Sequence, residues 1–289
     1  MHCLLAVVGL FFALMPVAAQ RPGGKEARHG MERIDSEEGA RRLGEFRQQR
    51  LDGDYVFEFQ LQHKPHRSSK TIRYDGIMWG TWNERGALTR FKILPDDENA
   101  DSSNPLLDLI VQNGSEPSAW IRNMSSGLFE LAEGDELFKP LLPGLVYSIY
   151  DLQMPFIYWD DFLYEGPSLV GASRVAQNFL MIPPEGSASA ERGIKGVRIG
   201  LDDTYNALWR VVVIGEDEKE LSRFAVESFK KVQEQYIVKR ITITDVESKD
   251  RTTFNVADSS VGLRLDDDVF RVPEIPASSS ENEDRSPLE

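Results

Sequence analysis

The sequence predicts a mainly β domain built as an antiparallel meander, and three observations support this. Short runs in which apolar and polar residues alternate recur along most of the chain, as in strands with one buried face. Turn residues such as Asp75-Gly76, Asn113-Gly114 and Gly215 separate these runs at short intervals. No helical pattern lies between the runs, although a parallel sheet would need helical crossovers.

One helix is expected ahead of the strands. Asp35 or Ser36 can cap its first turn, and Gly53 would end it. Its apolar residues recur at near-helical spacing, as expected for a helix that packs one face on a sheet: Leu43, Phe46 and Leu51.

The first expected strand has the clearest alternation, because Tyr55, Phe57, Phe59 and Leu61 alternate with mostly polar residues. With the runs that follow, the chain offers about a dozen strands. A sheet of this length must curl, close or split to hide its apolar face. The further runs are residues 71–82, 87–94, 107–112, 118–123, 127–131, 168–182, 194–201, 207–214, 220–230, 235–245 and 251–256.

The segment 151–167 (DLQMPFIYWDDFLYEGP) interrupts this pattern with a dense series of large apolar side chains. It is too short to span a bilayer. We therefore expect it either to plug the core or to cover an apolar opening, with Met154 to Tyr164 as a natural cover for the concave side of the sheet. The candidate lid residues are Met154, Pro155, Phe156, Ile157, Trp159, Phe162 and Leu163.

The two ends of the chain differ from its middle. Residues 1–19 carry no charged side chain, and an apolar run followed by small residues predicts a signal peptide cut after Ala19. An uncut membrane anchor is the alternative. Residues 20–31 are expected to form a flexible leader, 32–273 a single domain, and 274–289 a disordered acidic tail.

Cysteine usage and charge limit the compartment and the partners. The one cysteine, Cys3, lies inside the expected signal peptide, so the mature chain would have no disulfide and no thiol chemistry. Export without disulfides suits a bacterial periplasm. The net charge of −14 argues against nucleic acid and against sustained binding to a membrane surface.

No catalytic residue, metal site or cofactor is predicted. No histidine follows His66, so a Ser-His-Asp triad would have to use the turn that holds His63 and His66. The same pair lacks the further ligands of a metal site. A glycosidase stays open as an alternative, because Asp160, Asp161 and Glu165 lie among aromatic residues, but no fixed spacing supports it.

Several short motifs, densest after residue 140, occur in an order that resembles a known family. They are DLQMPFIYWD at 151–160, YEGP at 164–167, VGASRV at 170–175, VRIGLD at 197–202, SFKKV at 228–232, YIVKRI at 236–241 and DVF at 268–270. Together they resemble the LolA-like proteins, exported bacterial proteins usually labelled outer-membrane lipoprotein-sorting proteins.

The resemblance implies an unclosed antiparallel β-barrel of about eleven strands, with a few helices covering its concave face. It implies a monomeric periplasmic carrier that binds acyl chains of lipoproteins or other lipids under a lid. Inner- and outer-membrane lipoprotein-transfer proteins would be its partners. A related branch implies the alternative, an envelope-stress sensor or scaffold that binds a protein. An early-strand arginine latches the lid of the best-studied carrier, but neither Arg73 nor Arg90 can be aligned with it.

The physical requirement of a carrier agrees with these features. A protein that carries an acyl chain through water needs an apolar cavity, and burying the chain there gains about 0.8 kcal/mol per CH₂. It needs no nucleophile and no metal. For each candidate residue the alternative is ordinary core packing. The candidate cavity residues are Tyr55, Phe57, Phe59, Leu61, Ile72, Tyr74, Met78, Phe179, Met181, Val211 and Val213.

Overall fold

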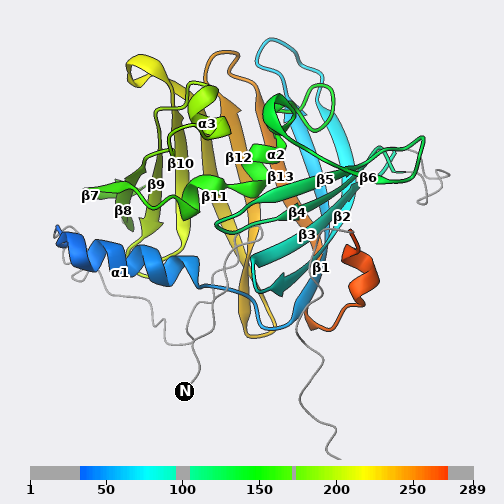
Figure 1. The fold of residues 1–289 in the computed structure, drawn as a ribbon, viewed down its shortest axis with the longest axis horizontal. Coiled ribbons are helices and arrows are strands. Elements are labelled where there is room, and N and C mark those ends of the chain that lie inside the picture. Colours follow the sequence, from blue (N-terminus) through cyan, green and yellow to red (C-terminus); the bar gives the residue numbers. More distant parts are fainter. Residues whose placement is uncertain (1–32, 96–104, 171–173, 273–289) are drawn as a thin grey trace, which may run out of the picture.

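The computed structural model describes residues 33–95, 105–170 and 174–272, and its main feature is one antiparallel sheet of thirteen strands (Figure 1). Apart from β6 and β7, strands that follow one another in sequence pair with each other, and β1 also pairs with β13. The sheet ends at β6 on one side and β7 on the other, and these two do not pair, so it is unclosed. The predicted mainly β, unclosed architecture is confirmed, with thirteen strands where the resemblance implied about eleven.

The strands are β1 Asp54–Lys64, β2 Ile72–Asn83, β3 Gly86–Ile93, β4 Leu107–Gln112, β5 Ser118–Arg122, β6 Phe129–Leu131, β7 Phe162–Val170, β8 Arg174–Met181, β9 Gly196–Asp202, β10 Leu208–Ile214, β11 Glu220–Val232, β12 Gln235–Asp245 and β13 Arg251–Leu263. The helices are α1 Ser36–Arg47, η2 Gly134–Phe138, α2 Ile149–Gln153, η3 Pro155–Tyr158, α3 Ala188–Glu191, η4 Glu216–Glu218 and η5 Asp267–Phe270.

The expected first helix is present but shorter than predicted. Asp35 caps α1 by accepting a hydrogen bond from the backbone N–H of Glu38 at 2.8 Å. The helix ends at Arg47, well before Gly53. Leu51 is nevertheless buried, because the chain that follows α1 packs on the same core as the helix.

Two strand predictions were wrong in detail. The run 168–182 is two strands, β7 and β8, and β7 already begins at Phe162. Asp75-Gly76 lies inside β2 and is not a turn. Gly76 pairs with Phe59, and a side chain there would put its Cβ 2.4 Å from the ring of Phe59. The glycine is therefore needed for the close approach of the Phe59 ring. A glycine with this role inside a strand resembles a turn residue in the sequence.

The alternation in β1 sorts its residues as predicted. Tyr55, Phe57, Phe59 and Leu61 are all buried and belong to the main core on the concave face. A smaller apolar cluster lies on the other face of β3 to β5, where Phe270 of η5 packs over strand residues. Its fully buried members are Leu88, Ile110, Trp120, Phe270 and Val272.

The predicted signal peptide (1–19), leader (20–31) and acidic tail (274–289) lie outside the described residues, and the single domain at 32–273 likewise stays a prediction. Within the described part of the chain, no helix has both the length and the apolar character needed to cross a membrane.

Candidate functional site

The concave face of the sheet is covered by residues 134–159, which include η2, α2 and η3 and which we call the plug. In Figure 1, α2 lies across the middle of the sheet. The apolar side chains of the plug and of the inner strand faces form one continuous core. The buried apolar residues of the plug are Leu145, Tyr147, Ile149, Tyr150, Leu152, Met154, Phe156, Ile157 and Trp159.

Five of the seven predicted lid residues lie in the plug. Met154, Phe156, Ile157 and Trp159 are buried against the sheet, and Pro155 begins η3. Phe162 and Leu163 instead belong to the edge strand β7, and Leu163 is 61% exposed. The covering segment therefore ends at Trp159, because from Phe162 the chain pairs with β8.

Most of the predicted cavity residues are fully buried on the inner strand faces. Ile72 and Tyr74 are exceptions, since they lie partly exposed on β2 at the rim of the sheet. The Tyr74 hydroxyl donates to the carbonyl of Pro143 in the plug at 3.3 Å. The buried ones are Tyr55, Phe57, Phe59, Leu61, Met78, Phe179, Met181, Val211 and Val213.

The space under α2 is nearly filled. An apolar pocket under α2 has a volume of about 10 Å³, which is about the volume of a single water-sized sphere. The open cavity expected from the sequence is not formed by the residues that line this pocket, because plug side chains occupy the space. An acyl chain could enter here only if the plug moved. The lining residues are Phe59, Leu61, Phe91, Ile93, Leu107, Leu141, Tyr147, Leu152 and Phe254.

Besides Tyr74, three side chains from separate elements bind the main chain of the plug. Asn113, in the β4–β5 turn, donates from Nδ2 to the carbonyls of Leu152 and Gln153 at 3.0 and 2.7 Å. Arg47 of α1 donates to two carbonyls of the η3 region, and Thr252 of β13 accepts from the N–H of Val146 at 3.0 Å. None of the three was predicted from the sequence.

Arg47 makes an unusual contact for an arginine. Its Nε and Nη2 donate to the carbonyls of Ile157 and Trp159, each at 2.6 Å. Desolvation lowers the pKa of the Arg47 guanidinium from its ordinary value. A cation held mainly by carbonyl groups keeps part of its desolvation cost, so this contact fixes the plug without stabilising it strongly.

Two further features of the plug, a buried hydroxyl and a strained backbone, also have an energetic cost. The Tyr147 hydroxyl is buried and has no hydrogen-bond partner among the described residues, and burial raises the pKa of Tyr147 well above its usual range. Met154 joins α2 to η3 with φ at 44°, a left-handed conformation that is strained for a residue other than glycine. The plug is therefore well packed but carries several unfavourable features.

Asp151 makes the stability of the plug depend on pH. Its carboxylate accepts from the N–H of Ser148 at 2.8 Å and from the Ser148 hydroxyl at 2.6 Å, while burial raises the pKa of Asp151 from 3.8 to about 6. Between these two values the folded state binds more protons than the unfolded state, so this group's contribution to stability falls as pH rises.

We expect Asp151→Asn to remove that part of the pH dependence. The free energy of unfolding of the wild-type protein should fall more steeply between pH 4 and pH 7 than that of the variant, because the asparagine does not titrate. Urea unfolding across this pH range measures both slopes. Equal slopes in the two proteins would show that Asp151 is not the titrating group.

The residues named for the alternative chemistries are each either exposed or bonded to a neighbouring side chain. His63 is buried with Nδ1 3.0 Å from the Thr252 hydroxyl, whereas His66 is exposed. Glu165 is bound by Arg198, with Nη2 to Oε1 at 2.8 Å, and Asp160 is exposed. Among residues 33–95, 105–170 and 174–272, no group of three or more His, Cys, Asp or Glu side chains is placed to hold a metal ion.

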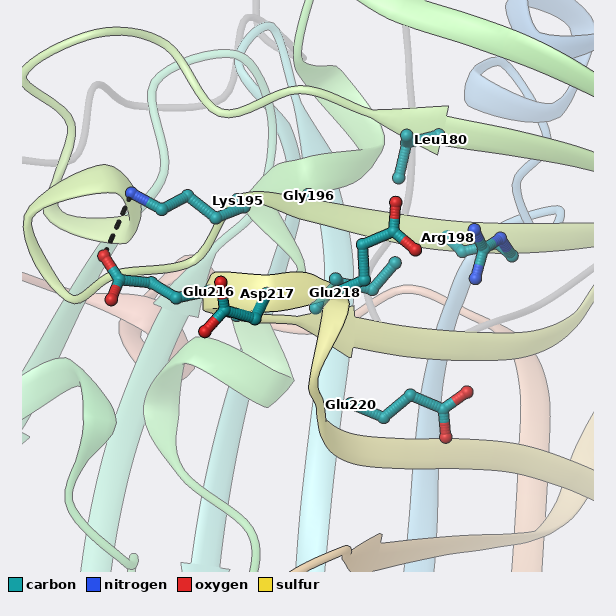
Figure 2. A pocket seen from close by; sticks show the side chains of 10 residues that line it. Leu180, Lys195, Gly196, Arg198, Glu216, Asp217, Glu218 and Glu220 are labelled. Carbon is teal, nitrogen blue, oxygen red and sulfur yellow. Dashed lines mark ion pairs between the residues drawn. The ribbon is translucent and has the colours of Figure 1, made fainter.

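A larger hollow of about 670 Å³ lies at the β10–β11 turn, and most of the residues that line it are charged (Figure 2). Glu216, Asp217 and Glu218 of η4 line it together with Glu220. Lys195 forms an ion pair with Glu216 at 3.4 Å. Its acidic lining does not suit an acyl chain, so the plug and the concave face are the candidate site.

Comparison with known proteins shows the fold. No protein-family model and no curated protein matches the chain. A putative outer membrane lipoprotein-sorting protein domain from Vibrio parahaemolyticus is similar at a TM-score of 0.64 and 13% identity, covering 84% of this chain and 97% of its own. A DUF1329 family protein from Desulfovibrio piger has a TM-score of 0.64 and 11% identity, covering 76% and 90%.

A LolA superfamily protein from Nitrosomonas europaea is also similar, with a TM-score of 0.56 and 11% identity, covering 76% of this chain and 91% of its own. Identities this low establish a shared fold and no shared activity.

Proposed function

We propose that this chain, which has the fold of the LolA-like proteins, is an exported carrier of the bacterial periplasm. It binds acyl chains of lipoproteins or other lipids between the concave face of the sheet and the plug. The observation that supports this most directly is the continuous apolar core shared by plug and sheet, with the plug's main chain held by a few side chains from other elements. Carriage of this kind needs neither a catalytic group nor a cofactor.

The energetics require the plug to remain over the ligand. Its nine buried apolar side chains would each cost about 1.5–3 kcal/mol if exposed to water. An acyl chain of about sixteen carbons returns roughly 12 kcal/mol when buried, at about 0.8 kcal/mol per CH₂. Binding therefore cannot compensate for a fully exposed plug. We infer that the plug shifts outward and packs against the ligand, as a lid does.

Uptake of a fluorescent fatty acid by delipidated protein tests the proposal. Binding should be saturable, and Phe156→Ala and Trp159→Ala should change its affinity or rate because both side chains would contact the ligand. Trp79→Ala is the matched control, since Trp79 packs on the outer face of the sheet. Absence of saturable uptake, with the plug variants altering only thermal stability, would contradict the proposal.

Native mass spectrometry of freshly purified protein provides a second readout. Co-purified lipid bound to a monomer is the expected result. A protein partner in place of lipid would favour the alternative of a sensing or scaffold protein with the same fold.

A further inference from the structure

The β1–β2 hairpin concentrates positive charge in an acidic protein. Its residues 64–73 include Lys64, Arg67, Lys70 and Arg73 and no Asp or Glu, whereas the whole chain carries a net charge of −14. All four side chains are exposed, and none of them forms an ion pair with another described residue. We call residues 64–73 the basic hairpin.

The basic hairpin lies at the rim where the plug meets the sheet. A Cβ on Gly144 of the plug would lie 3.1 Å from Cδ1 of Ile72, and the carbonyl of Pro143 accepts from Tyr74 just beyond the hairpin. On its other side, the backbone N–H of His66 donates to Asp250 in the β12–β13 turn at 2.7 Å. Figure 1 shows this hairpin, in cyan, beside the β12–β13 turn at the top of the sheet.

Charge is unevenly distributed along this edge of the sheet. The β12–β13 turn beside the hairpin is mixed, because Glu247 and Asp250 lie next to Lys249 and Arg251. The β10–β11 turn, two hairpins away on the same edge, is acidic (Figure 2). The edge therefore has a positive end at the basic hairpin and a negative end at the β10–β11 turn.

We propose that the basic hairpin docks the plug rim onto the surface of an anionic phospholipid bilayer. Lysine and arginine side chains bind lipid phosphates by charge-assisted hydrogen bonds, and each adds roughly fivefold to binding near such a surface. The remaining negative charge opposes binding only weakly, because interactions beyond about 8 Å are screened at physiological ionic strength. The net charge of the whole chain argues against membrane binding, but it does not show the local positive charge of the basic hairpin.

The orientation of the docked protein would bring the plug to the bilayer, and this part rests on the proposed function. The acidic β10–β11 turn lies on the same edge and would be repelled by the bilayer, so we expect the hairpin end of the edge to approach the surface first. The plug tip at Pro143 and Gly144, which contacts the hairpin, then faces the lipid. An acyl chain could pass under the plug without crossing a long path through water.

Cosedimentation of the delipidated mature chain with vesicles tests the docking. Vesicles of phosphatidylcholine with about one third phosphatidylglycerol should bind the protein, vesicles of pure phosphatidylcholine should not, and added NaCl should weaken binding. The variant Lys64→Gln, Arg67→Gln, Lys70→Gln, Arg73→Gln should bind the anionic vesicles about a hundredfold or more weakly, since four contributions of roughly fivefold are lost.

A matched variant controls for net charge. It replaces four cations away from this rim by glutamine, and so makes the same change of four charges: Arg41, Lys230, Lys231 and Arg271. Its vesicle binding should fall less than fivefold. An equal loss in both variants, or no binding of anionic vesicles by the wild-type protein, would overturn the proposal. Binding of polyglutamate without binding of vesicles would also overturn it, in favour of an acidic protein partner.

A parallel measurement separates this inference from the proposed function. Uptake of the fluorescent fatty acid from vesicle-free solution should be unchanged in the hairpin variant, since its four side chains lie outside the plug core. Loss of vesicle binding with normal uptake supports the docking surface. Wild-type protein that binds anionic vesicles but takes up no fatty acid would contradict the carrier function and leave the docking surface supported.

Discussion

Replacing Asn113 with alanine is expected to speed the entry of an acyl probe by about ten- to a hundredfold. In the closed structure the Asn113 amide donates to the carbonyls of Leu152 and Gln153 at the end of α2. A hydrogen bond contributes about 0.5–1.5 kcal/mol net, and its loss leaves a buried carbonyl unsatisfied. The closed state thus loses roughly 1.5–3 kcal/mol, whereas a state with the plug displaced loses nothing.

Asn178→Ala is the matched control for this prediction. Asn178 of β8 is also a buried amide, and it donates to the carbonyl of Gly166 at 2.8 Å and to the Ser168 hydroxyl at 2.9 Å. These bonds join β8 to β7 and do not involve the plug. Both variants should lose similar thermal stability, but only Asn113→Ala should change entry.

Stopped-flow fluorescence with excess probe measures the entry rate. Hydrogen exchange of the α2 amides adds an independent measure, since opening of the plug should raise exchange there in Asn113→Ala alone. If both variants speed entry equally, general loosening of the fold explains the effect. If neither does, Asn113 does not restrain a moving plug.

The strands were predictable from sequence where one face is buried and the other is exposed to solvent. In β1, Tyr55 and Phe57 alternate with Val56 and Glu58, and burial follows that alternation. The start of α1 was also predictable, because a capping aspartate bonds a backbone N–H within the first turn of its own helix. Local signals of this kind do not depend on how distant parts of the chain are arranged.

The residues that hold the plug were not predictable, because their contacts are distant in sequence. Asn113-Gly114 has the composition of a hairpin turn, which it is, but its amide bonds residues about 40 positions later. Arg47 is an ordinary basic residue at a helix end, yet it binds carbonyls more than 100 positions away. No spacing rule identifies either contact.

The sequence also could not decide between a filled and an open space under α2. A hollow barrel and a plugged barrel need the same apolar strand faces, so Phe59 or Met181 would be apolar in both. The end of the plug was misplaced for a related reason. Phe162 and Leu163 continue the aromatic run of η3, and only pairing with β8 shows that they begin a strand.

Asp108→Ala is expected to cause the largest loss of stability, about 3–5 kcal/mol. Asp108 lies on the outer face of β4 with no exposed surface, and Arg90 donates to both of its oxygens, at 2.8 and 2.7 Å. Arg122 adds a second cation at 3.6 Å. Without the carboxylate, the Arg90 side chain, which is only 15% exposed, would lie unpaired beside another positive charge.

Two controls distinguish this mechanism from a general effect of removing an acid. Glu45→Ala also removes one carboxylate from an arginine, but both partners in that pair are more than half exposed, so the cost should stay within about 1 kcal/mol. Arg90→Met combined with Asp108→Leu should cost less than Asp108→Ala, because neither charge is then left unpaired. Urea unfolding at neutral pH gives all three values.

The same variants assign the role of Arg90. Its Nη1 donates to the carbonyl of Val269 at 2.8 Å, so it binds the C-terminal segment around η5 to the outer face of the sheet. It therefore lies on the face opposite the plug, where it cannot restrain a lid directly. Asp108→Ala should raise hydrogen exchange in η5 and leave the entry rate of the acyl probe unchanged at temperatures where the protein is folded. A change in entry matching that of Asn113→Ala would instead mean that the early-strand arginine is coupled to the plug through the sheet.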